Sequence, residues 1–369
     1  MASWAGFPDR PAPVAVVWKP MHQNALSMDV RLRIRHLDPG CFALVMATGI
    51  VSIDVGQHGM TALARALFGL NLLAYAALLL MSALRLRWFP RELLADFVSP
   101  GRGAGFLTLA AATCVLGSQC LLVVRLPRLA DGLLLAGAVS WAALVYLFLA
   151  AAITARIKPG FTRSINGGWL VAVVATQALA VLLVLRTASA SAFDPVGLFT
   201  ALCLYLLGAA LYLLIITLVV YRLVFFPLRA RDFTPPYWIN MGALAITALA
   251  GSLLVRHIPP ADSLTPLLPF VKGFTLFFWA TATWWIPLLV ILEGWRYLWR
   301  RVPLRYEADD WDIVFPVGMY TVATYELAQA LQLDFLQVIP DVGVYVSLAV
   351  WLFFAVAGLR RLFRHRTQA

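Results

Sequence analysis

Charged residues are scarce in this chain of 369 residues, since Asp, Glu, Lys and Arg together make up 13% of it. Acidic residues are the scarcer sign, with 18 Asp and Glu against 29 Lys and Arg. Soluble domains carry about 25% charged residues. The chain is instead 62% hydrophobic, with a mean hydropathy of +0.83. This composition excludes a soluble globular protein and predicts an integral membrane protein.

Sequence signatures of membrane enzymes and pumps are also missing. No G-x-x-x-x-G-K-[ST] phosphate loop occurs, and the stretches between apolar runs are too short for a nucleotide-binding domain, so a primary pump is disfavoured. No H-E-x-x-H or G-x-S-x-G motif occurs, which disfavours an enzyme. We expect no metal and no other cofactor. The four cysteines all lie in apolar runs, at Cys41, Cys114, Cys120 and Cys203. They have no metal-ligand spacing unless Cys114 and Cys120 are counted, and we predict that they are buried free thiols.

Ten apolar runs make up most of the chain. Most of them reach the length of about 18 residues that a helix needs to cross the hydrocarbon of a bilayer. We therefore predict an all-α integral membrane protein with ten transmembrane helices. The predicted spans are 37–56, 64–84, 105–124, 132–155, 168–185, 195–221, 237–255, 273–292, 311–331 and 342–359.

Positive charge falls on one side of these spans. If the chain begins in the cytoplasm, 23 of the 29 Lys and Arg lie on the cytoplasmic side. The six on the other side are Arg65, Arg125, Arg128, Arg186, Arg256 and Lys272. The asymmetry predicts a plasma or inner membrane protein with both termini in the cytoplasm. The net charge of +11 then belongs to arginines that contact lipid headgroups, and nucleic acid is not an expected partner.

The ten spans pair into five hairpins. Weakly charged segments join most odd-numbered spans to the next even one, whereas basic segments join even spans to the following odd ones. Every hairpin then starts on the same side, so the five could be related by rotation about an axis along the membrane normal. Even spans carry large aliphatic and aromatic residues suited to lipid, while odd spans carry more small and hydroxyl residues suited to helix packing. We therefore place the odd spans around a central axis.

Polar residues within the odd spans are the candidates for function. Glu326 could couple transport to protons or make a structural hydrogen bond near the outer interface or at a subunit contact, and we favour the structural interpretation. Asp54 is expected to be interfacial and solvated. The neutral candidates could line a pore or merely tie helices together, and they are Thr48, Thr113, Gln119, Thr176, Gln177, Asn240, Thr247, Thr321 and Thr324.

The sequences DPGCFALVMATGIVSI in the first span, PPYWINMGALAIT in the seventh and WDIVFPVGMYTVATYEL in the ninth resemble the tellurite-resistance/dicarboxylate transporter family. That family includes bacterial tellurite-resistance permeases, yeast malate and sulfite transporters, and slow anion channels of plant guard cells. The resemblance runs from about residue 36 to about residue 360. It implies five hairpins in a quasi-fivefold arrangement, a homotrimer, and a pore in each protomer lined by the odd helices.

In that family a phenylalanine of the ninth helix plugs the pore, and the resemblance places this role on Phe315, which precedes Pro316. An apolar plug blocks ions by dewetting and opens with a small side-chain rotation. The alternative is that Phe315 is a packed aromatic residue of the interior.

The predicted function is transport of small anions across a lipid bilayer, with a C4-dicarboxylate, tellurite, sulfite or an inorganic anion as the substrate. Helix N-termini and the excess of arginine at the cytoplasmic face favour anions, and few acidic residues offset them. The alternatives are a proton-coupled dicarboxylate transporter and a membrane sensor with a closed pore. The predicted domains are a mobile cytoplasmic tail at 1–35, the transport domain at 36–362 and a short cytoplasmic tail at 363–369.

Overall fold

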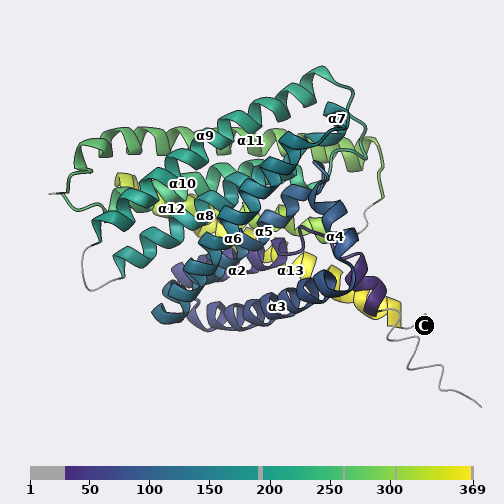
Figure 1. Cartoon of the computed structure of the whole chain (residues 1–369). Helices are drawn as coiled ribbons and strands as arrows, with labels where there is room; N and C mark the ends of the chain where they lie inside the picture. The colour runs from purple at the N-terminus through teal and green to yellow at the C-terminus, as the bar shows by residue number, and fades with distance from the viewer. Residues whose placement is uncertain (1–29, 190–193, 261, 304–305, 367–369) are drawn as a thin grey trace, which may run out of the picture.

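The computed structural model describes residues 30–189, 194–260, 262–303 and 306–366, with side chains up to residue 361. Most of the predicted N-terminal tail, residues 1–29, and the last three residues lie outside this part. Within the described ranges every regular element is a helix (Figure 1). Residues 30–35, which the sequence assigns to the tail, are helical, and Ile34 is buried there.

Each predicted span overlaps an α-helix. Eight of these helices are long and apolar enough to cross a membrane; α2 is shorter, and α12 does not reach the same apolar character. The helices are α2 Ala43–Gln57, α3 Thr61–Trp88, α5 Thr108–Leu122, α6 Pro127–Thr154, α8 Val171–Ala188, α9 Pro195–Phe225, α10 Ile239–His257, α11 Leu268–Gly294, α12 Trp311–Leu331 and α13 Val338–Arg366.

The helices form two shells. In the segments that contain α5, α8 and α10, 72 to 94% of the most apolar window is buried, whereas the corresponding share is 11 to 39% for α3, α6, α9, α11 and α13. Most residues of α2 and α12 are buried as well. The five buried helices, α2, α5, α8, α10 and α12, are called the inner helices below, and the other five the outer helices. The expectation that small and hydroxyl residues mark the central helices agrees with this burial.

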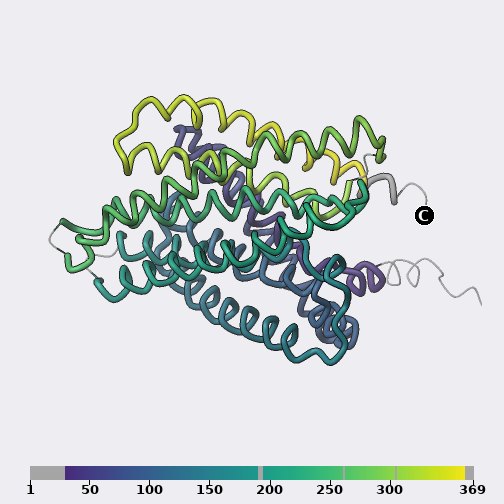
Figure 2. The backbone as a smooth tube through the Cα atoms, turned by 90° about the horizontal axis from the view of Figure 1, so that it is seen from above, coloured from purple at the N-terminus to yellow at the C-terminus, as the bar shows by residue number. Residues whose placement is uncertain are grey.

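The inner helices contact one another in a closed cycle. Contacts join α2 to α5, α5 to α8, α8 to α10, α10 to α12, and α12 back to α2. Each outer helix packs on the inner helix that precedes it in the chain, α3 on α2 and so on to α13 on α12. Figures 1 and 2 show the long helices side by side, with both ends of the described chain at one end of the bundle.

Short helical turns precede the inner helices at that end. The 3-10 turns η1 (Gly103–Leu107), η2 (Gly167–Leu170), η3 (Pro235–Trp238) and η6 (Ala308–Asp310) lead directly into α5, α8, α10 and α12, and successive turns contact one another. The approach is close because Gly167 has no side chain: a Cβ atom there would lie 2.3 Å from the carbonyl oxygen of Pro236. The N-termini of the inner helices are thereby gathered together.

The remaining short elements lie in the connections. Helices α4 (Pro90–Phe97) and α7 (Phe161–Ser164) lie at the same end of the bundle as the gathered N-termini (Figure 1). The 3-10 turns η4 (Thr265–Leu267) and η7 (Asp334–Gln337) precede α11 and α13, and a π-helical turn, η5 (Trp295–Trp299), extends α11. Three of the cysteines are buried or half-buried as predicted, but Cys203 is exposed on the outer helix α9.

Candidate functional site

A cavity lies between the five inner helices. The empty space here is about 470 Å³ when the open space at its mouth is included, and each inner helix contributes three residues to the wall. The lining residues are Ile50, Ile53 and Gln57 of α2, Val115, Ser118 and Leu122 of α5, Ala178, Val181 and Leu185 of α8, Ile246, Leu249 and Leu253 of α10, and Met319, Val322 and Glu326 of α12.

The lining residues follow the same spacing in all five helices. In each helix the second lining residue comes three positions after the first, and the third comes four positions after the second. Residues at these intervals lie on one face of an α-helix. All five helices therefore turn a face of the same register toward one axis.

The wall of this cavity is almost entirely apolar. Its polar members are Ser118, whose hydroxyl donates to the Cys114 carbonyl oxygen of its own helix, and the pair Gln57 and Glu326 at the C-terminal end of the stripe. The amide Nε2 of Gln57 donates to Oε1 of Glu326 at 2.9 Å. Polar groups therefore mark one mouth of the cavity, where the inner helices end.

Phe315 lies one helical turn beyond the stripe of α12, on the side of the helix N-terminus. It lies four positions before Met319, so the lining face of α12 continues through it. It is 1% exposed and packs on the neighbouring helix α10, because a Cβ atom at Gly242 would lie 3.2 Å from two of its ring carbons. The same Cβ atom would lie 3.0 Å from Cγ of Pro316. An aromatic ring thus reaches from α12 to the backbone of α10, four positions before the first lining residue of each of these helices.

The predicted pore-lining residues are not among those that line the cavity. Five of them receive or share a hydrogen bond with an aromatic side chain of an outer helix. The pairs are Trp351 Nε1 to Thr48 (3.1 Å), Tyr75 Oη with Thr113 (2.7 Å), Trp141 Nε1 to Thr176 (2.8 Å), Tyr212 Oη to Asn240 (2.9 Å) and Trp279 Nε1 to Thr324 (2.9 Å).

These five hydrogen bonds repeat one relationship around the bundle. Each outer helix bonds to the inner helix that follows it, and α13 bonds to α2. The other candidates also bond elsewhere: Gln177 donates to the Tyr205 carbonyl of α9, Gln119 accepts from Asn71 of α3, and Thr247 and Thr321 bond within their own helices. Seven of the nine candidates thus take part in hydrogen bonds between helices.

Glu326 lies at the polar mouth of the cavity rather than on the outside of the protein. Nη1 of Arg256, in the last turn of α10, donates to its Oε2, and Gln57 donates to its Oε1. Three inner helices are joined at this carboxylate. The carboxylate accepts both hydrogen bonds, as expected of a residue that anchors helices. Because Glu326 is also part of the cavity wall, its carboxylate can contact an ion that enters the cavity.

Asp54 is fully buried, so the expectation of a solvated carboxylate was wrong. Helix α13 covers it: the Ser347 hydroxyl donates to Oδ2 at 2.5 Å, and the exposed fraction of Asp54 is 0%. His58 lies 3.4 Å from Oδ1 through its Nδ1, and its Nε2 lies 3.8 Å from Asp341 of α13. Asp54 therefore belongs to the contact between the first and last long helices and does not face the cavity.

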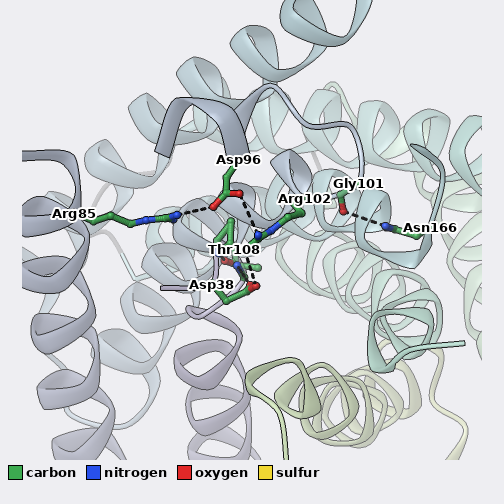
Figure 3. Close-up of polar contacts among 9 residues, drawn as sticks. Asp38, Arg85, Asp96, Gly101, Arg102, Thr108 and Asn166 are labelled. Atoms are coloured by element: carbon green, nitrogen blue, oxygen red, sulfur yellow. Dashed lines mark hydrogen bonds and ion pairs between the residues drawn. The ribbon is translucent and has the colours of Figure 1, made fainter. Parts of the chain in front are cut away.

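A chain of ion pairs links the segments that precede the inner helices (Figure 3). Asp96 accepts from Arg85 at 2.5 Å and pairs with Arg102 at 3.1 Å, and Arg102 in turn lies 3.5 Å from Asp38. Asp38 also accepts the backbone N–H of Gly40 at 2.7 Å. The starts of α2 and α5 are held together by these contacts.

Acidic residues gather at this end of the bundle, which the sequence pattern did not reveal. Burial, together with the nearby carboxylates of Asp38, Glu307 and Asp310, raises the pKa of Asp309 to about 7, and Arg102 partly opposes this. Burial also raises the pKa of Asp310, which forms a capping box with Glu307 at the start of η6. Asp38 and Asp309 are far apart in sequence, so only the folded chain brings their charges together. The described residues include no cluster of Cys, His, Asp or Glu that could hold a metal ion.

Comparisons with known proteins show that the chain is similar to membrane proteins and transporters. The chain is 45% identical over 154 residues to an uncharacterized membrane protein of Mycobacterium tuberculosis. The aligned part covers 41% of this chain and 77% of that protein. The chain is 23% identical to two uncharacterized transporters of Methanocaldococcus jannaschii, over 87% of this chain and 92% and 90% of theirs. A family model described as voltage-dependent anion channel matches residues 36–359. The match confirms the resemblance given by the sequence motifs, and the protein belongs to the voltage-dependent anion channel family.

Proposed function

We propose that the chain passes small anions across the membrane along the axis of the five inner helices. The observation that carries this proposal is the cavity whose wall takes three residues at the same spacing from each inner helix. In this proposal the chain has ten transmembrane helices, arranged as five hairpins in quasi-fivefold order. Helices α2 and α12 count as spans because the outer helices shield them from lipid, so they need not be as apolar as helices in contact with lipid.

Phe315 is the proposed gate, with Pro316 as its support. A proline inside a helix removes one backbone hydrogen bond and bends the helix, which leaves the helix around Phe315 easier to adjust. The ring lies against Gly242, where no side chain opposes a rotation. An apolar constriction excludes ions by dewetting, so a modest rotation of this ring would open the path.

The apolar wall favours a channel over a tightly binding carrier. Fast conduction requires weak binding along the path, and the wall offers polar groups only at Ser118, Gln57 and Glu326. Inorganic anions, sulfite, tellurite and C4-dicarboxylates are the substrate classes that the family suggests. We place the protein in the plasma or inner membrane as a homotrimer, with the gathered N-termini of the inner helices facing the cytoplasm.

Proton-coupled transport is the second candidate, and the position of Glu326 in the cavity wall favours it. A carboxylate that carries the coupled proton must face the substrate path, as Glu326 does. In Glu326→Gln the dependence of transport on a pH gradient should then vanish while transport down an anion gradient persists.

The test is an anion-replacement series with purified protein in planar bilayers or liposomes, with and without a pH gradient. Reversal potentials that follow the permeant anion alone support the channel. Anion movement driven by the proton gradient supports coupling. If neither the wild type nor Phe315→Ala passes any anion, the transport proposal fails and a sensor with a closed pore takes its place.

A further inference from the structure

We propose that Arg256 recruits anions to the C-terminal mouth of the cavity and that Glu326 limits this attraction by pairing with it. The inference rests on the proposed anion pathway and names the residues that set its electrostatics at one end. Glu326 contributes to the cavity wall, and Arg256 is its ion-pair partner from the neighbouring helix.

The position of Arg256 follows from the register of α10. It comes three residues after Leu253, the last lining residue of that helix, and so lies about one turn further along the same face. Its side chain is 39% exposed, whereas that of Glu326 is 10% exposed. The guanidinium therefore lies at the open side of the mouth and the carboxylate on its inner side.

The guanidinium has donors left for an anion. Among the described residues its hydrogen-bond partner is Glu326, which takes Nη1. A guanidinium group is a planar fork of several N–H donors that can bind a carboxylate or another oxyanion at two points. An anion approaching from the open side could therefore contact the fork while Glu326 remains bound.

A cation is needed at this mouth because the helix termini there disfavour anions. The C-terminal end of a helix carries a partial negative charge, and all five inner helices end around this mouth. Glu326 adds a full negative charge to the wall. Without Arg256, the Glu326 carboxylate in the wall would lose its ion-pair partner, and its negative charge would repel an anion that enters or leaves here.

Arg186 lies at the corresponding end of the inner helix α8, but it is not part of the mouth. It directly follows the lining residue Leu185, but its guanidinium turns outward to Asp131 of the outer helix α6, with Nη2 3.2 Å from Oδ2. Arg186 and Asp131 thus form an arginine–carboxylate ion pair whose members do not line the cavity. It is the matched control for the pair of Arg256 and Glu326.

The two members of the mouth pair should have opposite effects on anion current. Neutralising Glu326 leaves an unpaired positive charge at the mouth, and neutralising Arg256 leaves an unpaired negative charge. One unit charge acting at about 4 Å through water changes a local ion concentration by about five-fold, and added salt screens the effect. A change of structure alone would produce no such reversal of sign.

The experiment measures chloride current in planar bilayers, with Phe315→Ala as the parent protein so that the path is open. Glu326→Gln should raise the current about five-fold at low ionic strength and Arg256→Gln should lower it about five-fold. The double variant and Arg256→Lys should stay close to the parent, and each effect should shrink as a bulky impermeant salt is added. Arg186→Gln and Asp131→Asn should leave the current unchanged.

Two results would overturn the assignment. If both single variants and the double variant reduce the current while eluting normally from a sizing column, the pair only anchors helices. If none of them changes the current, the pair lies outside the ion path. Absence of any current in the parent would instead contradict the anion pathway itself, so the two failures are distinguishable.

Discussion

The indole Nε1 of Trp351 donates a hydrogen bond to the hydroxyl of Thr48 across 3.1 Å, joining the last outer helix to the first inner helix. No connecting segment joins α13 to α2, because they lie at opposite ends of the chain. The ring is therefore closed here by side chains, and the bond from Ser347 to the buried Asp54 lies in the same contact. Four other aromatic hydrogen bonds repeat the relationship between neighbouring hairpins that the chain does connect.

Breaking this hydrogen bond should loosen the closure of the ring. Thr48→Val removes the acceptor and Trp351→Phe removes the donor, and each should lower the free energy of unfolding by about 0.5–1.5 kcal/mol. Since both changes remove the same bond, the double variant should lose less than the two single losses added together. Thermal unfolding in detergent measures all three. Thr281→Val is the control, because the hydroxyl of the half-buried Thr281 donates to the Phe277 carbonyl oxygen of its own helix.

If the losses of the two single variants simply add, the bond does not couple the two helices, and the closure depends on other contacts. The same outcome would remove the reason to regard the five aromatic bonds as a repeated device.

Asp309 should make the N-terminal end of the bundle sensitive to pH. Its pKa in the folded protein is about 7, above the usual aspartate value near 3.9. The folded protein therefore holds a proton that the unfolded chain has already lost. Stability from this group is complete at low pH, and it falls as the pH rises toward and through about 7.

The measurement compares thermal unfolding of the wild type and Asp309→Asn from about pH 5 to about pH 8. The asparagine variant should gain stability relative to the wild type as the pH rises, because it never acquires the charge beside Asp38 and Glu307. Asp334→Asn, at an exposed position, should follow the wild type. A constant difference between wild type and Asp309→Asn over this range would show that Asp309 is already ionised throughout.

A larger side chain at position 242 should be able to replace the gate when the Phe315 ring is removed. A side chain at this position points at the Phe315 ring, because its Cβ atom would lie 3.2 Å from two ring carbons. In the Phe315→Ala background, Gly242→Leu should fill the vacated space and reduce the anion current again. Gly69→Leu is the control, since a Cβ atom at Gly69 would have no neighbour within 4 Å. A double variant that conducts as well as Phe315→Ala would show that the ring does not occupy the ion path at Gly242.

The two shells could be predicted from composition, since lipid-facing helices need large apolar side chains and buried ones can be small or hydroxylated. The direction in which the hydroxyl groups point could not be predicted from composition. Thr48, Thr113 and Thr176 each come two positions before the first lining residue of their helix. Two positions turn an α-helix by about 200°, so these side chains face the opposite way from the cavity.

The polar residues that sequence reasoning proposed for a pore are not among those that line the cavity, whose wall is the apolar stripe of each inner helix. Apolar residues occur on every face of an inner helix, so hydropathy alone does not identify the stripe. The environment of Asp54 was misjudged because Ser347, which covers it, is distant in sequence. The pKa shift of Asp309 was missed because burial and the distant Asp38 add to the effect of its neighbours Glu307 and Asp310.

The most direct test of the account compares anion currents of the wild type, Phe315→Ala and Phe315→Leu at matched protein levels. If Phe315 is the gate, the alanine variant should conduct well above the wild type and the leucine variant should lie between them, because less of the constriction remains. An aromatic residue of the interior behaves differently, since truncating it typically costs about 3–5 kcal/mol of stability and opens no path. A Phe315→Ala protein that is well folded yet no more conductive than the wild type would contradict the central claim.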